Sequence, residues 1–265
     1  TAVTDGLTVA GNVSVDGGTI KLDGNYPTGT GNVALGDGAL DDSSLSGSYN
    51  TAIGGNALTE HESGSYNTAV GFGGLAANTT GSSGVAVGTN ALLSNTTGSS
   101  NVAIGYQALD ANTTASNNTA VGKGALTANT TGAQNIAIGM GCMSANTEGN
   151  DNIAMGVSAL DANTTGSNHT ALGRQALQAN TTGSNNTAVG LNALNASTTA
   201  NNDVAVGNQA MKTSTTASST TALGATALYS LTTVDNNTAV GFASSYSTTT
   251  GGNNTSVGTY SFYTN

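Results

Sequence analysis

Hydrophobic and polar positions alternate along most of the chain in a 17-residue block that returns many times. In all but one of the fourteen blocks an alanine lies between a β-branched residue and an aliphatic residue, and a glycine follows, as in Val102-Ala103-Ile104-Gly105. β-Branched residues favour the pleated backbone of a strand, and residues two apart share one of its faces. Each block is therefore predicted to contain one short strand that ends at the glycine.

The glycines keep this spacing through most of the sequence. From Gly36 to Gly258 the residue number of the glycine rises by 18 once and then by 17 in each of twelve steps. Glycine tolerates a positive φ, where a Cβ would clash, so a corner of the chain is expected after each strand. The corner glycines of the central blocks are Gly105, Gly122, Gly139, Gly156, Gly173 and Gly190.

An Ala-Leu pair follows three and four residues after the glycine, as at Ala108-Leu109, and a segment such as Asn163 to Gly166 follows the pair. The pair predicts a second short strand, whose Leu meets the aliphatic residue of the first, and the Asn-Thr-Thr-Gly segment has turn chemistry. A helical unit would instead place apolar residues at a spacing of 3.6. The chain is predicted to be an all-β parallel β-solenoid, or β-roll, of about 14 coils.

Stacked coils bring equivalent residues into columns, with backbone hydrogen bonds along the axis. Fourteen coils at roughly 4.8 Å predict a rod on the order of 65 Å long. Asn stands four residues before the glycine in ten of the fourteen blocks. Stacked Asn amides can bond from coil to coil, which accounts for this column without a ligand.

The alanine two residues before the glycine recurs in thirteen blocks, and only Ser256 departs from it. A solvent-facing column would be free to vary, so another surface is expected to approach this column closely. We interpret it as a seam between copies of the chain; the alternative is a tight corner within one chain. The central members of the expected seam are Ala103, Ala120, Ala137, Ala154, Ala171 and Ala188.

Composition excludes several classes of protein. Only 7% of the residues are charged and 38 are Gly, which is typical of a disordered linker, but a linker has no reason to keep a fixed period. The chain has four basic residues and 14 acidic ones, too few positive charges to form a surface that binds the phosphate backbone of a nucleic acid. No apolar run is long enough to predict a membrane span.

The sequence shows no combination of residues that is typical of a catalytic site. His61 and His169 are far apart in the chain, six coils from each other, and both are predicted to be solvated. The single cysteine, Cys142, takes the place of a small Ala and is predicted to be a packed thiol that forms no internal disulfide. No pair of carboxylates recurs in one column, so the sequence predicts neither an enzyme nor a metal or other cofactor.

The two ends depart from the pattern. Residues 1–31 lie outside the repeat; their alternation at 6–10, 13–15 and 19–22 predicts three short strands that cap or connect the repeat domain of residues 32–265. Aromatic residues gather in the last coils, where three tyrosines spaced by 17 predict a stacked ladder. This group is a candidate surface for binding sugars or proteins, or alternatively a seam to a following domain; its members are Tyr229, Phe242, Tyr246, Tyr260 and Tyr263.

The run from Asn101 to Leu109, Asn-Val-Ala-Ile-Gly-Tyr-Gln-Ala-Leu, resembles the head repeats of YadA-like trimeric autotransporter adhesins. Those repeats are 14-residue units, and the longer 17-residue form here is similar to repeats of phage tail-fibre proteins. The resemblance covers residues 32–265. It implies a left-handed parallel β-roll in which three chains assemble outside the cell, on a virion tail fibre or a cell surface.

The expected function is therefore that of a non-enzymatic fibre or adhesion segment, which acts as a rigid spacer and a host- or surface-attachment element. Its expected partners are two further copies of the chain and a cell-surface glycan or protein receptor. Two alternatives remain open at this stage. One is a self-assembling extracellular filament; the other is an ice-binding solenoid that uses the Thr ladder of Thr79, Thr96 and Thr113.

Overall fold

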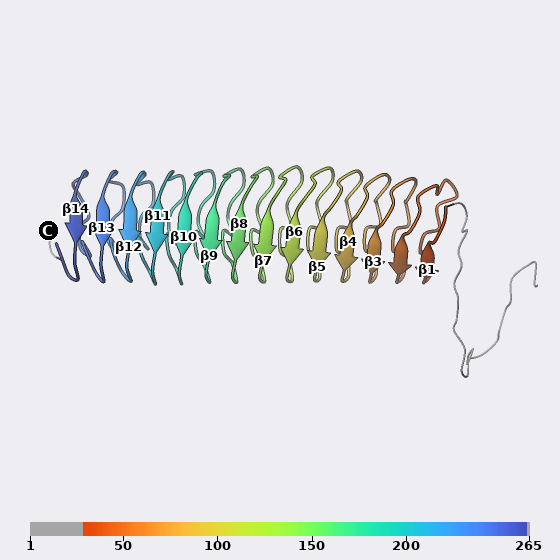
Figure 1. The fold of residues 1–265 in the computed structure, drawn as a ribbon, viewed down its shortest axis with the longest axis horizontal. Helices are drawn as coiled ribbons and strands as arrows, with labels where there is room; N and C mark the ends of the chain where they lie inside the picture. The colour runs from red at the N-terminus through yellow and green to blue at the C-terminus, as the bar shows by residue number, and fades with distance from the viewer. Residues whose placement is uncertain (1–28, 264–265) are drawn as a thin grey trace, which may run out of the picture.

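The computed structural model describes residues 29–263, which wind into one parallel β-solenoid (Figure 1). Each coil contributes one strand of three residues, and the described residues contain no helix. The strands are β1 (Val33–Leu35), β2 (Thr51–Ile53), β3 (Thr68–Val70), β4 (Val85–Val87), β5 (Val102–Ile104), β6 (Thr119–Val121), β7 (Ile136–Ile138), β8 (Ile153–Met155), β9 (Thr170–Leu172), β10 (Thr187–Val189), β11 (Val204–Val206), β12 (Thr221–Leu223), β13 (Thr238–Val240) and β14 (Thr255–Val257).

The strands form a single sheet whose order follows the sequence from β1 to β14. Each strand pairs with the next in parallel and without slippage, so that Ala103 lies opposite Ala120 and Ala120 opposite Ala137. The predicted parallel β-solenoid with a 17-residue repeat is confirmed. The three short strands predicted within residues 6–22 lie outside the described residues.

The corner after each strand requires glycine. At Gly105 the φ angle is 135°, and a Cβ built there would lie 2.6 Å from the carbonyl oxygen of Gly122 in the next coil. The other five central corner glycines also have positive φ angles. The corner prediction is confirmed, and it has two causes: the backbone conformation and the close approach of the neighbouring coil.

The Ala-Leu pair does not form the predicted second strand. Gln107 and Leu109 have φ angles of 54° and 53°, in the left-handed region, so the chain zigzags through turns from residue 105 to 111. The N–H of Leu109 still donates to the carbonyl of Ala125 in the next coil, at 3.0 Å. Coil-to-coil hydrogen bonds therefore continue on this wall, although its backbone is not extended.

The interior is also arranged differently from the prediction. The strand alanines of β2–β13 are fully buried within the single chain, whereas none of the aliphatic residues before the corner glycines is buried. Opposite the strand alanines lies the wall that holds Ala108 and its equivalents: Cys142 of that wall donates to the carbonyl of Ala154, with Sγ 3.2 Å from the oxygen. The space between the walls admits small side chains, and Leu109 and its Leu and Met equivalents fill the rest of it with side chains that are at most 1% exposed.

The predicted inter-chain seam along the alanine column is therefore wrong. A side chain with no exposed surface in one chain cannot contact a second chain. The alternative, close packing within one chain, explains why the column hardly varies. The residues concerned, all with 0% exposure, are Ala103, Ala120, Ala137, Ala154, Ala171 and Ala188.

Two columns of buried amides link the coils. In the first, Oδ1 of Asn118 accepts from the backbone N–H of Asn135 in the next coil, 2.9 Å away. In the second, Nδ2 of Asn95 donates to Oδ1 of Asn78 in the preceding coil at 2.8 Å. The predicted bonding from coil to coil is thus present. In the first column, however, the amides bond mainly to backbone, with one amide-to-amide bond from Asn254 to Asn237. The second column is a chain of amide-to-amide bonds from Asn78 to Asn180.

Candidate functional site

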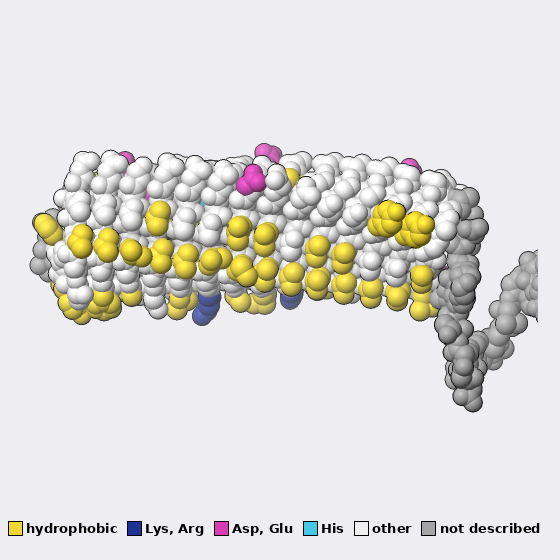
Figure 2. Space-filling view, viewed as in Figure 1, with side chains coloured by type: hydrophobic (Ala, Val, Ile, Leu, Met, Phe, Trp, Pro, Cys, Tyr) yellow, Lys and Arg dark blue, Asp and Glu magenta, His cyan; other side chains and the backbone are white. Residues whose placement is uncertain are grey.

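The outer surface of the sheet carries an apolar surface along the whole length of the described solenoid. Because side chains alternate along a strand, burial of the central Ala turns both of its neighbours outward, and Ile104 is 41% exposed. Figure 2 shows the result: one continuous row of hydrophobic side chains along the rod, with a second, interrupted row beside it. We call this surface the sheet face; it consists of the first and third residues of strands β1–β14.

The two rows of the sheet face differ in chemistry. The third strand residue is aliphatic in all fourteen strands, from Leu35 to Val257. The first residue is Val or Ile in six strands and Thr in eight, as in Thr119. The sheet face of residues 33–257 carries no charged side chain, because all strand residues are Val, Ile, Leu, Met, Thr, Ala or Ser. An uncharged apolar surface of this length is typical of a protein–protein interface.

The predicted tyrosine ladder is present at the far end of the rod. The rings of Tyr229 and Tyr246 stack with centroids 5.0 Å apart, and those of Tyr246 and Tyr263 stack at 5.3 Å. Lys212 lies beyond Tyr229, with Nζ 5.7 Å from the ring centroid. Both ring faces of Tyr246 are therefore covered by aromatic neighbours, and its side chain is half-buried rather than exposed.

More exposed aromatic rings lie beside the ladder. Tyr260 contacts both Phe242 and Tyr263 edge to face, each with centroids 5.3 Å apart. Phe242 is 48% exposed, Tyr260 54% and Phe262 56%. The five candidate surface-binding residues are thus brought together in one cluster of ring contacts. We call these residues the aromatic end: Tyr229, Phe242, Tyr246, Tyr260 and Tyr263.

A second aromatic pair was not singled out from the sequence. Tyr49 and Tyr66 stack with centroids 5.3 Å apart near the other end of the rod, and both are exposed. They occupy equivalent turn positions with positive φ angles. Their spacing of one full repeat is the signal that could have found them, since equivalent positions in adjacent coils always become neighbours.

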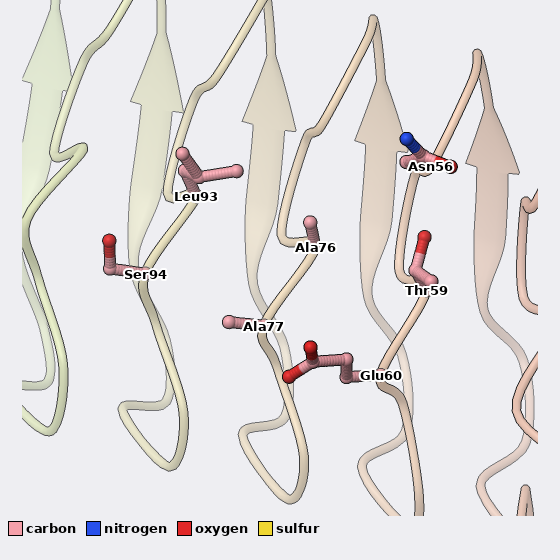
Figure 3. Close-up of a pocket in the computed structure, with 7 residues that line it drawn as sticks. All are labelled: Asn56, Thr59, Glu60, Ala76, Ala77, Leu93 and Ser94. Atoms are coloured by element: carbon pink, nitrogen blue, oxygen red, sulfur yellow. The ribbon is translucent and has the colours of Figure 1, made fainter.

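A shallow notch of about 470 Å³ opens on the wall opposite the sheet (Figure 3). It forms where the small side chains of Ala76 and Ala77 lie between larger residues of the two adjacent coils. Glu60 is its single titratable group, so the notch offers no pair of groups for acid–base chemistry. Its lining residues are Asn56, Thr59, Glu60, Ala76, Ala77, Leu93 and Ser94.

The two histidines are buried, contrary to the prediction that they are solvated. His61 replaces Asn in the second amide column, and one of its ring nitrogens, Nε2, lies 2.7 Å from the carbonyl oxygen of Gly64. His169 replaces Asn in the first column, where its Nε2 lies 2.7 Å from the carbonyl oxygen of Gly183. Burial lowers the pKa of His169 to about 4, so this imidazole is neutral near pH 7.

The other titratable groups do not converge on a reactive centre. Cys142 is fully buried as predicted, and burial raises the pKa of its thiol to about 12, which leaves the unreactive thiol form. Burial also raises the pKa of Asp110. Within residues 29–263, no three His, Cys, Asp or Glu side chains lie close enough together to hold a metal ion.

The Thr ladder has its hydroxyl groups engaged. Oγ1 of Thr79 donates to the carbonyl of Thr96 in the next coil at 3.1 Å, and Thr96 donates to Thr113 in the same way at 3.0 Å. These side chains are half-buried. Their hydroxyl protons therefore bond within the solenoid and are not directed to an external lattice.

Comparison with known proteins gave no matching family model, no matching curated protein and no matching solved structure. The described part of the chain has no helix long and apolar enough to cross a membrane. The functional assignment therefore depends on the surfaces described above, and chiefly on the sheet face.

Proposed function

We propose that this chain is a rigid, non-enzymatic segment of an extracellular fibre, which assembles with two further copies of itself through the sheet face. The role fits a spacer and attachment element of a phage tail fibre or a surface adhesin. The observation that carries the proposal is the uninterrupted aliphatic row from Leu35 to Val257, none of whose members is buried in the single chain.

Self-association is favoured over a different partner because the sheet face is uniform along the rod. A second copy has the same 17-residue period, so its aliphatic rows can match these rows coil for coil along the full length. Burial of apolar surface contributes roughly 25 cal/mol per Å², and a long interface adds many such contacts. Thr side chains in the second row allow close approach and bring no charge that would need a partner.

Sedimentation equilibrium tests the assembly directly. The wild-type chain is expected to sediment at three times its own mass. The double variant Ile104→Lys/Val121→Lys places two charges on the sheet face and is expected to sediment as a monomer. The matched control is Tyr106→Lys/Met140→Lys, because the column after the corner glycine already holds Lys123 and Arg174. A monomeric wild type, or a trimeric sheet-face variant, would contradict the proposal.

Attachment is assigned to the aromatic end, where exposed rings are available to a sugar or a receptor. The double variant Phe242→Ser/Tyr260→Ser should lose binding to target cells or glycans and keep the fibre's oligomeric state. Replacement of Tyr49 and Tyr66 by Ser, at the other end of the rod, serves as the control. Equal binding by all three proteins would refute this part of the proposal. Ice binding is not favoured, because the hydroxyls of the Thr79 column donate within the solenoid.

A further inference from the structure

The residues that follow the corner glycines form a second surface, along one edge of the rod. In the coils of β3–β10 every one of these residues is exposed and none is Asp or Glu. We call this column, taken at 17-residue intervals from Phe72 to Leu191, the corner ridge. Most of its side chains are large and apolar, among them Phe72 at 57% exposure and Tyr106 at 49%. The corner ridge therefore offers aromatic rings to solvent away from the aromatic end.

The corner ridge also holds two of the three basic residues in the described part of the chain. Lys123 and Arg174 are both exposed on it and lie three coils apart, which is about 14 Å at the spacing of parallel strands. In Figure 2 the Lys and Arg side chains in view lie along one edge of the rod, and the Asp and Glu side chains in view lie towards the opposite edge. A chain with a formal net charge of −10 thus keeps one positive edge.

Neither of these charges is neutralised by the protein. Within residues 29–263 the Arg174 side chain makes no hydrogen bond or ion pair, so its planar fork of donors is free to bind a carboxylate. Nζ of Lys123 lies 5.9 Å from the ring centroid of Tyr106 in the preceding coil. Lys123 and Tyr106 therefore present a positive charge and an exposed ring at one place.

Neutral amides lie beside the charges. Gln107 and Gln175 directly follow ridge residues and are half-buried, with left-handed φ angles of 54° and 58°. Their side-chain amides make no hydrogen bond within the described residues. An amide group both donates and accepts hydrogen bonds. These two side chains are therefore suited to the hydroxyl groups of a sugar.

We propose that the corner ridge binds an acidic polysaccharide, a sugar chain with carboxylate groups, laid along the rod. Arg174 and Lys123 pair with carboxylates of the sugar chain. The rings of Tyr106 and Phe72 stack on apolar faces of its sugar units. A linear ligand fits because the ridge side chains repeat in every coil along one line.

Other anionic partners fit the corner ridge less well. Two cations neutralise too few phosphates to hold a nucleic acid. An acidic peptide would pair with Lys123 and Arg174, but it has no use for the exposed rings and the free amides between them. The positive edge of a negative rod selects an anion, and the rings and amides select a sugar.

The proposal goes beyond the fibre and attachment role and does not depend on it. The residues that carry it belong to the coils of β3–β10, whereas the aromatic end begins at Tyr229. The corner ridge is also a different column from the sheet face, which ends at the residue before each corner glycine. Binding of an acidic sugar can therefore be measured separately from assembly and from attachment.

Isothermal titration calorimetry tests the proposal, with the full chain and a linear oligomer of galacturonic acid long enough to span Lys123 and Arg174. Lys123→Gln and Arg174→Gln are each expected to weaken binding about fivefold at low salt. The double variant should weaken it about 25-fold, because the two sites are too far apart to interact. The matched control is Lys212→Gln, which removes the same charge from beside Tyr229 and should bind like the wild type.

Two further ligands separate the sugar from its charge. A neutral glucose oligomer of the same length should not bind measurably, and poly-glutamate of the same charge should bind more weakly than galacturonate. Tyr106→Ser should weaken galacturonate binding about threefold, through the lost ring contact, and leave poly-glutamate binding unchanged. Poly-glutamate that binds as tightly as galacturonate would identify the partner as an acidic peptide and overturn the proposal.

The remaining outcomes also decide the matter. Unchanged affinity in the double charge variant, or an equal loss in Lys212→Gln, would overturn the proposal. So would a changed sedimentation mass of the double charge variant, since the corner ridge would then belong to the fibre interface. Phe242→Ser/Tyr260→Ser should bind galacturonate like the wild type. A monomeric wild type that binds galacturonate would contradict the fibre and support the corner ridge.

Discussion

The backbone N–H of Asn135 donates to the side-chain Oδ1 of Asn118, 2.9 Å away in the preceding coil. The same Asn118 side chain donates through Nδ2 to the carbonyl of Gly132. The buried Asn118 side chain therefore accepts a hydrogen bond from the backbone of the next coil and donates one to the backbone of its own coil. Asparagine meets both needs without charge, and this explains its recurrence in the column.

Asn118→Ala is expected to destabilise the solenoid by about 2–4 kcal/mol. The variant removes the acceptor of the Asn135 N–H and one of the donors to the Gly132 carbonyl. The matched control is the adjacent, exposed Asn117→Gly, which keeps a positive φ and should change stability by less than about 1 kcal/mol. Thermal unfolding followed by circular dichroism measures both. Similar Tm values for the two variants would refute a structural role for the buried amide.

His169 predicts a loss of stability in acid. Its pKa is lowered from 6.5 to about 4 by burial, so folding favours the neutral ring. Its contribution is present above pH 6.5 and is lost as the pH falls toward 4, by up to about 3 kcal/mol. His169→Asn restores the amide of the neighbouring coils and should remove this loss. A variant whose acid unfolding matches that of the wild type would show that His169 is not the sensitive group.

Asp203 predicts the opposite pH dependence of stability. Its pKa is raised from 3.8 to about 7 by burial, so folding favours the protonated carboxyl. Its contribution is complete below pH 3.8 and is lost as the pH rises to 7, by up to about 4 kcal/mol. This slope opposes that of His169 between about pH 4 and 6.5. The single variant Asp203→Asn should therefore be more stable than the wild type at pH 8.

The corner glycines predict a strong difference between two substitutions. Gly105→Ala places a Cβ 2.6 Å from a backbone oxygen at a φ of 135°, and should cost at least about 3 kcal/mol. Gly124→Asn should be tolerated, because Asn90 and Asn192 occupy the same position with similar φ angles. The yield of folded protein and the Tm compare the two. Equal stability would mean that the neighbouring coil moves aside readily.

The tyrosine ladder predicts a local loss of stability. Tyr246→Ser removes two stacked contacts and should cost about 1–3 kcal/mol, at roughly 0.5–1.5 kcal/mol for each pair. Tyr106→Ser removes an exposed ring that has no aromatic neighbour among the described residues, and should change stability little. Near-ultraviolet circular dichroism and hydrogen exchange at the last coils report the difference. Equally fast hydrogen exchange in both variants would contradict a stabilising role for the stacked ring of Tyr246.

The 17-residue period was sufficient to predict the fold, because a backbone that repeats its conformation must wind regularly and bring equivalent residues together. For the same reason the stacking of Tyr229 on Tyr246 and the corner at Gly105 could be predicted. The wall after the corner could not. A left-handed φ at a buried leucine such as Leu109 is unfavourable locally, and it arises because the neighbouring coils accept its hydrogen bonds and enclose its side chain.

The sequence by itself determined the repeat, the strand that precedes each corner glycine, the corner glycines and the columns. Only the tertiary structure decided which side of each strand faces inward, since Val102-Ala103-Ile104 alternates equally well in either orientation. The interior is narrow enough that Ala103 lies inside and Ile104 outside. That choice moved the candidate interface from the alanine column to the sheet face. It also showed His169 and Asp203 to be buried links between coils, because burial depends on neighbours one coil away rather than on local polarity.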